Sequence, residues 1–243
     1  MSFFRVLPFE TGPGAYNMAA DEALLLAAQR GQASLRGYTW SEATVSLGYF
    51  QSAVSRLSAG LGALPFVRRP SGGATLVHHH ELTYCLAVPA GAPHGAAQKW
   101  MPRMHRVIIR ALERFGLAGK LRLVEGSGER HGDVLCFQQY TPGDVLCEGH
   151  KVVGSAQRKQ RQALLQHGGI LLAQSEFAPQ LPGIRELTGV SPAAEEVMGA
   201  VIEEFEKETG WPRQVTYWNA QDQANIAGLI EERYGNRAWN EKR

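Results

Sequence analysis

Apolar residues follow the two-residue period of a β-strand in the middle of the chain and the helical period elsewhere. Every second residue from Leu82 to Val88 is apolar or aromatic, which predicts a strand. Residues 66–88 together predict a strand, a glycine turn and a second strand. Residues 35–50 predict two strands, and residues 134–172 predict several, with a hairpin tip at residues 158–161.

Four segments show the helical period, and they predict helices over residues 17–31, 104–116, 194–209 and 221–234. In the first, Asn17 is the predicted N-cap, and Asp21 and Glu22 are predicted near the helix start. Strands and helices do not alternate regularly, which argues against a doubly wound parallel sheet. We expect an α/β (α+β) fold with a central mixed, mostly antiparallel β-sheet flanked by helices, forming a single domain over residues 1–243.

Composition narrows the class of protein. The 243 residues are 44% hydrophobic and carry a formal net charge of +2, which gives no reason to expect nucleic-acid binding. No apolar run reaches the roughly 18–20 residues that span a bilayer, and the N-terminus lacks the features of a signal peptide. Three cysteines without metal spacing indicate a reducing compartment, so the expected location is cytoplasmic.

Two short stretches carry candidate chemistry. Arg68-Arg69-Pro70-Ser71-Gly72-Gly73 predicts a turn whose amides converge on a carbonyl, carboxylate or phosphate. Arg68 and Arg69 would point to opposite faces, so at most one reaches such a site easily. Residues 149–157 predict a strand in which Lys151 meets an acyl carbonyl or carboxylate and Gly154 and Ala156 leave space. Alternatively, these are an ordinary hairpin turn and a solvated lysine.

Cys136 and the histidines are less clear from the residues alone. Cys136 is either a small buried hydrophobe or a nucleophile whose thiolate Lys151 favours. Cys85 and Cys147 are predicted to pack in the core. His167, beside two glycines, either lines a pocket or satisfies a buried backbone group. His78-His79-His80 alternate faces and lack partners at zinc spacing, so no metal site is predicted.

Several motifs in one order resemble the lipoate-protein ligase and octanoyltransferase branch of the biotin/lipoyl protein ligase superfamily, closest to the LipM type. The matching segments are residues 17–25, Trp40 with residues 44–51, the R-R-x-[ST]-G-G match at 68–73, His78 with residues 81–84, the G-R-K-[IV]-x-G-S-A-Q match at 149–157, L-Q-H-G at 165–168, and Tyr234 with Trp239-Asn240. The chain departs from the pattern at Ala74, His79 and His150.

The resemblance implies a catalytic domain with an acyl pocket and no C-terminal accessory domain. It implies Cys136 as nucleophile, because LipM-type enzymes carry a cysteine in this position, and Lys151 as a contact of the acyl carbonyl. The residues implied to line the site are Arg68, Ser71, Gly72, Gly73, His78, Gly154, Ser155, Ala156, His167 and Gly168.

The activity implied is transfer of octanoyl from octanoyl-acyl carrier protein, through a cysteine thioester, to the lipoyl-domain lysine of a carrier such as glycine cleavage H protein or a 2-oxoacid dehydrogenase E2. No cofactor is then required, and neither nucleic acid nor membrane is a partner. Both implied partners are acidic, so Arg103, Arg106, Arg110 and the hairpin tip are candidates for docking them. The alternatives are an ATP/Mg-dependent lipoate ligase subunit, an octanoyl amidotransferase, and a non-catalytic acyl-carrier-binding protein.

Overall fold

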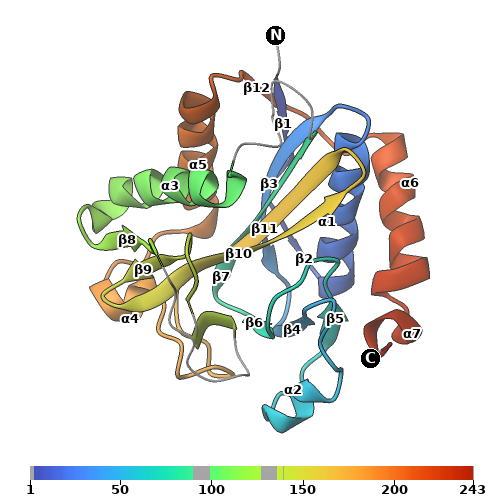
Figure 1. Cartoon of the computed structure of the whole chain (residues 1–243), viewed down its shortest axis with the longest axis horizontal. Coiled ribbons are helices and arrows are strands. Elements are labelled where there is room, and N and C mark those ends of the chain that lie inside the picture. The colour runs from blue at the N-terminus through green and yellow to red at the C-terminus, as the bar shows by residue number, and fades with distance from the viewer. Residues whose placement is uncertain (1–2, 90–98, 127–135, 139, 243) are drawn as a thin grey trace.

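A large mixed sheet runs through the centre of the molecule (Figure 1). The computed structural model describes residues 3–89, 99–126, 136–138 and 140–242. Within these residues the sheet has nine strands, in the order β12-β1-β3-β7-β11-β10-β9-β8, with β2 paired to β3. They are β1 (Phe4–Val6), β2 (Glu10–Gly12), β3 (Ala33–Trp40), β7 (Glu81–Pro89), β8 (Leu121–Leu123), β9 (Val145–Cys147), β10 (His150–Gln160), β11 (Ala163–Leu171) and β12 (Arg213–Val215).

The pairing confirms the predicted mixed, mostly antiparallel sheet. From β3 through β7, β11, β10 and β9 to β8 every pair is antiparallel. Only the pairs made by β1 and β2 are parallel.

A second sheet, which the sequence pattern did not predict, holds three strands in the order β5-β4-β6. They are β4 (Thr44–Leu47), β5 (Phe66–Arg68) and β6 (Leu76–His78). The predicted strand and glycine turn of residues 66–88 are present, but the predicted second strand is two strands, of which β6 joins β5 in flanking β4 and only β7 enters the large sheet. The glycine turn connects β5 to β6 across β4.

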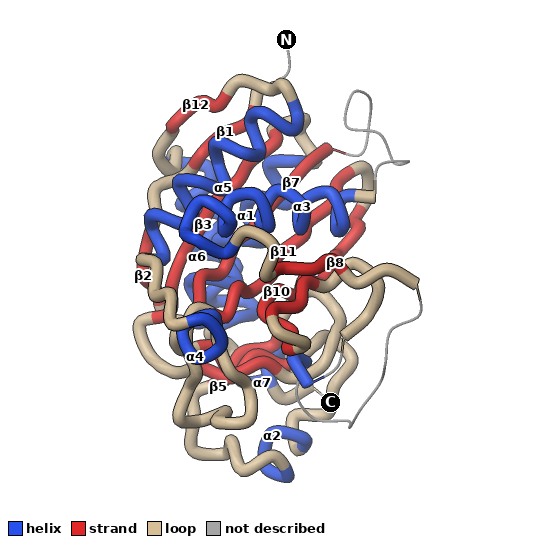
Figure 2. The backbone as a smooth tube through the Cα atoms, turned by 90° about the vertical axis from the view of Figure 1, so that its left-hand side faces the viewer, coloured by secondary structure: helices blue, strands red, loops and turns tan. Residues whose placement is uncertain are grey.

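Helices cover both faces of the large sheet (Figure 1). On one face lie α1 (Gly14–Ala28) and α6 (Ala220–Leu229), which continues as η3 (Ile230–Tyr234) and is followed by α7 (Arg237–Asn240). On the other lie α3 (Trp100–Leu112), extended by η1 (Glu113–Leu117), and α5 (Ala194–Thr209), seen from their own side in Figure 2. The short elements are α2 (Ser55–Ser58), η2 (Cys136–Gln138) and α4 (Ile184–Thr188).

Strand β7 sends its side chains alternately into two cores. Leu82, Tyr84, Leu86 and Val88 pack in the core under α3 and α5, as their spacing predicts. Cys85 packs with the residues of α1 on the opposite face, and Cys147 packs under α3. Both cysteines are buried, which confirms their predicted packing role.

The first helix differs from its prediction. It begins at Gly14, and Asn17 lies inside it, where the side-chain amide donates a hydrogen bond to the Gly12 carbonyl (2.9 Å). Asp21 and Glu22 are not acids exposed near the helix start but buried residues in its middle. The cause is tertiary, because β3 and the C-terminal helices supply cationic and phenolic partners for both carboxylates.

Two smaller observations bear on the sequence predictions. The turn between β10 and β11 falls at Arg161-Gln162, so Arg158 lies within strand β10 and not at a hairpin tip. Within the described residues, no helix combines the length and apolar character needed to cross a membrane.

Candidate functional site

A pocket lies where the glycine turn after β5 meets strands β10 and β11. Its volume is about 450 Å³ with its open mouth included, and its surface is mainly apolar. It is lined by Met18, Tyr38, Arg69, Gly73, Leu76, His78, Thr83, Gly154, Ser155, Ala156, His167, Gly168 and Gly169. The structure thus brings together seven of the ten residues predicted to line an acyl site, from three separate parts of the chain.

Arg68 does not line this pocket. Its guanidinium is fully buried and donates hydrogen bonds to the carbonyls of Gly48 (3.0 Å) and Gln51 (2.6 Å). Its backbone N–H donates to the Asn240 side chain, and its guanidinium to the Asn240 carbonyl. The neighbouring Arg69 lines the pocket instead, so one of the two arginines reaches it and Arg68 fixes the loop behind it.

Three features fix the conformation of the glycine turn. Gly73 has φ +99°, a conformation that favours glycine. Arg69 donates from its guanidinium to the carbonyls of Gly72 (3.1 Å) and Ala74 (2.9 Å) inside the turn. Arg158 donates to the Pro70 carbonyl (2.8 Å) from strand β10. Ser71 and Gly72 are part of this turn and lie next to the pocket without lining it.

Lys151 lies over the face of Gly154. A side chain at Gly154 would overlap the Lys151 Cε, so the glycine is what allows the lysine to cover this end of the pocket. The Lys151 Nζ is buried and forms an ion pair with Asp144 (2.8 Å). Lys151 therefore lies beside the pocket lining, adjacent to Gly154.

The η2 segment lies against the same strand. The Phe137 ring is 5.2 Å from the Lys151 Nζ, measured to the ring centroid. Cys136 begins η2 and directly precedes Phe137, and the η2 segment contacts strand β10. The Cys136 side chain and residues 127–135 lie outside the described part of the chain.

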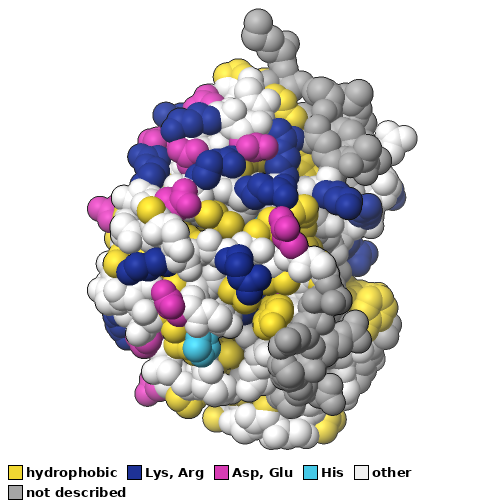
Figure 3. Space-filling model, turned by 60° about the vertical axis from the view of Figure 1, so that its left-hand side comes forward, with side chains coloured by type: hydrophobic (Ala, Val, Ile, Leu, Met, Phe, Trp, Pro, Cys, Tyr) yellow, Lys and Arg dark blue, Asp and Glu magenta, His cyan; other side chains and the backbone are white. Residues whose placement is uncertain are grey.

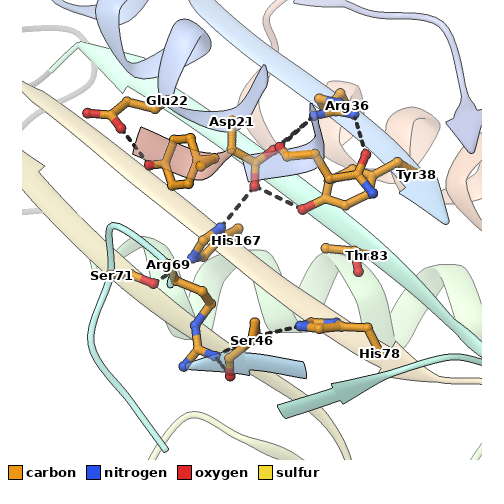
Figure 4. Close-up of polar contacts among 12 residues, drawn as sticks. Asp21, Glu22, Arg36, Tyr38, Ser46, Arg69, Ser71, His78, Thr83 and His167 are labelled. Carbon is orange, nitrogen blue, oxygen red and sulfur yellow. Dashed lines mark hydrogen bonds and ion pairs between the residues drawn. The ribbon is translucent and has the colours of Figure 1, made fainter. Parts of the chain in front are cut away.

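His167 connects the pocket to the buried acid of α1. Its Nδ1 lies 2.9 Å from the Asp21 Oδ2, and its Nε2 lies 2.5 Å from the Ser71 hydroxyl (Figure 4). Asp21 also accepts hydrogen bonds from the Tyr38 hydroxyl (2.9 Å) and the Arg36 guanidinium (3.2 Å). Asp21 was not predicted as a residue near the pocket. The available signal was a pair of acids, Asp21 and Glu22, between apolar residues in the middle of a helical run.

His78 forms a second chain of contacts on the opposite side of the pocket. Its Nδ1 lies 2.5 Å from the Glu81 Oε1, and its Nε2 lies 2.6 Å from the Ser46 hydroxyl. The ring stacks on Trp40 with centroids 3.8 Å apart. Arg69 donates to the Ser46 hydroxyl (2.6 Å), so this chain of contacts is joined to the glycine turn.

The Ser155 hydroxyl is directed away from this chemistry. It lies 2.6 Å from the Tyr84 hydroxyl and 2.6 Å from His105 Nε2, under α3. His105 Nδ1 donates to the Gly143 carbonyl, and burial lowers the His105 pKa to about 4. Burial also raises the pKa of Tyr84. Ser155 therefore contributes backbone to the pocket while its side chain belongs to a neutral network on the other face.

The arginines of α3 considered for docking lie among acids. Arg103 pairs with Glu208 (3.0 Å), and Arg110 pairs with Glu208 (2.7 Å) and Glu204 (3.5 Å), while Arg106 is exposed. Figure 3 shows basic and acidic side chains interspersed on this side of the molecule. Among the residues that the structure describes, no group of three or more His, Cys, Asp or Glu side chains is placed to hold a metal ion.

Comparisons with known proteins show the family of this chain. Residues 13–206 match the model of the lipoyl protein ligase A/B catalytic domain. The chain is 32% identical to octanoyltransferase LipM of Geobacillus kaustophilus, covering 95% of both chains. It is also 32% identical to octanoyltransferase LipM of Kyrpidia tusciae, covering 86% of this chain and 88% of the relative.

Solved structures agree on the fold. Protein Ta0514 of T. acidophilum, a putative lipoate protein ligase, superimposes with a TM-score of 0.80 at 20% identity, over 100% of both chains. A lipoate-protein ligase A bound with ATP gives a TM-score of 0.75 at 19% identity, over 99% of both chains. The chain belongs to the lipoyl protein ligase A/B catalytic domain family.

Proposed function

We propose that this protein is an octanoyltransferase that moves an octanoyl group from an acyl carrier thioester to the lysine of a lipoyl domain. The observation that carries the proposal is the position of Lys151, which lies over Gly154 at the pocket and beside the η2 segment that begins with Cys136. The curated relatives at 32% identity, named octanoyltransferases, support the same reaction.

Cys136 is the proposed nucleophile. Its thiolate attacks the thioester carbonyl carbon of the donor, the new C–S bond forms, and the donor thiolate leaves. The Lys151 ammonium favours the cysteine thiolate and donates a hydrogen bond to the acyl oxygen as negative charge develops there. The glycine turn and the backbone of residues 154–156 bind the acyl group in the mainly apolar pocket.

The acceptor then takes the octanoyl group from Cys136 as an amide. The proposed donor is octanoyl-acyl carrier protein, and the proposed acceptor is a lipoyl-domain protein such as glycine cleavage H protein or a 2-oxoacid dehydrogenase E2. Because the thioester is already activated, the reaction requires no ATP. A thiol nucleophile functions in a reducing compartment, so we also propose a cytoplasmic location.

The test is intact-protein mass spectrometry after incubation with octanoyl-acyl carrier protein without ATP. We expect one octanoyl adduct on the wild-type protein and none on Cys136→Ser. Cys147→Ala is the matched control, because Cys147 is buried in the core, and it should still take the adduct. An adduct that persists in Cys136→Ser would overturn the assignment of the nucleophile.

The same preparation distinguishes the alternatives. Adenylate formation from free lipoate and ATP would indicate a ligase subunit. Transfer only from an octanoylated carrier protein, and not from the acyl carrier thioester, would indicate an amidotransferase. Binding of the acyl carrier with neither adduct nor adenylate would indicate a non-catalytic protein.

A further inference from the structure

A row of four residues crosses the floor of the pocket from strand β10 to strand β3. Each residue is the direct partner of the next across the sheet, so their side chains, where present, share one face. The row is Gly154 in β10, Gly169 in β11, Thr83 in β7 and Tyr38 in β3, and all four residues line the pocket. Along this row the side chains increase in size, from none at the two glycines to a large ring at Tyr38.

The spacing of the strands gives the row a length. Neighbouring strands lie about 4.8 Å apart, so Gly154 is about 10 Å from Thr83 and about 14 Å from Tyr38. A fully extended chain advances about 1.2 Å per bond, so the seven C–C bonds of an octanoyl group span about 8 Å. An octanoyl chain that begins over Gly154 therefore passes over Gly169 and ends against Thr83.

The proposed reaction determines where the chain begins. The Lys151 side chain lies over Gly154, so an acyl carbonyl that contacts Lys151 lies at the β10 end of the row. A Cβ atom at Gly169 would lie 3.0 Å from the Glu81 Oε2 and would cover the pocket floor. The absence of a side chain at Gly169 leaves the path from β10 to β7 open.

Two hydrogen bonds fix the orientation of Thr83. Its hydroxyl accepts one from the Trp40 indole N–H (2.9 Å) and donates one to the Glu81 carboxylate (2.6 Å). Thr83 is buried, so rotation of its side chain would leave buried polar groups without partners. The methyl group of Thr83 therefore has a fixed position in the row.

The residues behind Thr83 are equally fixed. Tyr38 is fully buried, and its hydroxyl donates a hydrogen bond to Asp21 (2.9 Å; Figure 4). Met18, which lines the pocket from helix α1, is buried in the same core as Tyr38. Because packed side chains of this kind move little, a chain that is too long gains no space from small adjustments.

We propose that Thr83 sets the length of the acyl chain that the pocket accepts, because it stops an eight-carbon chain that begins at Lys151. The inference rests on the proposed function and concerns the selectivity of the same site. A six-carbon chain leaves space in front of Thr83, and a ten-carbon chain overlaps its methyl group. One methylene group in an apolar pocket changes selectivity by about 10–200-fold, so octanoyl should be preferred over decanoyl by at least about 10-fold.

The experiment is a competition between acyl chains of different length. The protein is mixed with equal amounts of hexanoyl-, octanoyl-, decanoyl- and dodecanoyl-acyl carrier protein, and intact-protein mass spectrometry measures the proportions of the four adducts at short times. In Thr83→Ser, which keeps the hydroxyl and removes the methyl group, the ratio of decanoyl to octanoyl adduct should rise by about 10-fold or more. In Thr83→Ile, which adds a carbon, the ratio of octanoyl to hexanoyl adduct should fall by a similar factor.

Thr83→Val separates the size of the side chain from its hydrogen bonds. It keeps the branched shape and loses both bonds, so it should be less stable than the wild type and keep the wild-type proportions of adducts. Thr39→Ser makes the same change as Thr83→Ser outside the pocket, because Thr39 follows Tyr38 on the opposite face and contacts Thr11. This control should match the wild type in rate and in proportions. Proportions within one mixture do not depend on how much of a variant folds.

Wild-type proportions in both Thr83→Ser and Thr83→Ile would overturn the inference. A wild-type preference for dodecanoyl would overturn it as well, since the chain would then pass Thr83 and stop at Tyr38. A shift in Thr83→Val as large as that in Thr83→Ser would show that hydrogen bonds, and not size, set the length. If none of the four donors gives an adduct, the proposed function itself fails, so the two failures are distinguishable.

Discussion

The two faces of strands β10 and β11 hold histidines of nearly equal burial that have different hydrogen-bond partners. On the face toward α1, His167 contacts the carboxylate of Asp21. On the face toward α3, His105 donates to a backbone carbonyl and contacts the neutral hydroxyl of Ser155. Both rings are at least 96% buried, at 4% and 0% exposure. The difference lies in the partner, so burial alone does not determine the electrostatic surroundings of a histidine.

Two glycines in the β10–β11 ladder show a second difference between these faces. Gly154 opens toward the pocket, where Lys151 occupies the space that a side chain would need. Gly168, which pairs with Ser155, opens toward the other face, where the Ser155 side chain and the Gly154 carbonyl occupy it. On the pocket face, the absence of a side chain at Gly154 leaves space for the charged end of Lys151. On the other face, the absence of a side chain at Gly168 leaves space for Ser155 and its neutral hydrogen-bond network.

The largest effect is expected from Gly154→Ala. The added methyl group overlaps the end of the Lys151 side chain, which is buried and ion-paired with Asp144, so the free energy of unfolding should also fall, by about 1–3 kcal/mol. Loss of a positioned donor to the acyl oxygen should slow acyl-enzyme formation by about 10²–10³-fold. The rate of octanoyl adduct formation and urea denaturation of the same preparation check this. A rate near that of the wild type would mean that Lys151 does not act from this position.

An intermediate effect, on the free energy of unfolding, is expected when the pH is lowered, and it arises from His105 on the face toward α3. Burial lowers the pKa of His105 from 6.5 to about 4. Below pH 6.5 the unfolded chain binds a proton that folded His105 does not, so the free energy of unfolding falls as pH decreases toward 4. The full contribution of His105 is present above pH 6.5. Its loss by pH 4 is about 3 kcal/mol, from about 1.4 kcal/mol per pKa unit.

Urea denaturation of the wild type and His105→Gln between pH 4 and 7 measures this contribution. The variant should lose stability less steeply as pH falls, because it removes a group that only the unfolded chain protonates. Parallel curves for the two proteins would contradict the assignment of His105 as a neutral buried ring.

The smallest effect is expected from Gly168→Ala. Its methyl group would meet the backbone carbonyl of Gly154, which cannot move as freely as a lysine side chain. We expect a loss of about 1–3 kcal/mol in the free energy of unfolding. Adduct formation per folded molecule should fall less than in Gly154→Ala. If Gly168→Ala reduced activity more than Gly154→Ala, the division between the two faces would be wrong.

Much of the fold followed from local pattern. The alternation in residues 82–88 predicts the buried strand β7 because sheet faces have a period of two. Local pattern could not show that β4, β5 and β6 form a separate sheet, since pairing between strands is set by tertiary contacts that spacing does not encode. The mixed, mostly antiparallel main sheet was predicted, and its partner sheet was not.

The site was predictable where residues contribute through the backbone. Gly73 and Gly154 were indicated because glycine permits close approach, Gly168 was implied by the family resemblance, and all three line the pocket. Arg68 and Arg69 could not be distinguished, because the choice depends on which carbonyls surround each guanidinium. Asp21 was misjudged as a helix-start acid, since its partners Arg36, Tyr38 and His167 come from other elements.

The contact between Arg68 and Asn240 has a consequence for synthesis of the chain. These residues are 172 positions apart, and Trp239 also donates to the Arg68 carbonyl (3.1 Å). The loop behind the glycine turn therefore gains its last hydrogen-bond partners only after the ribosome has made residues up to Asn240. A nascent chain whose residues 239–240 are still in the exit tunnel lacks them, so the order of translation itself delays a complete pocket until α7 has left the ribosome.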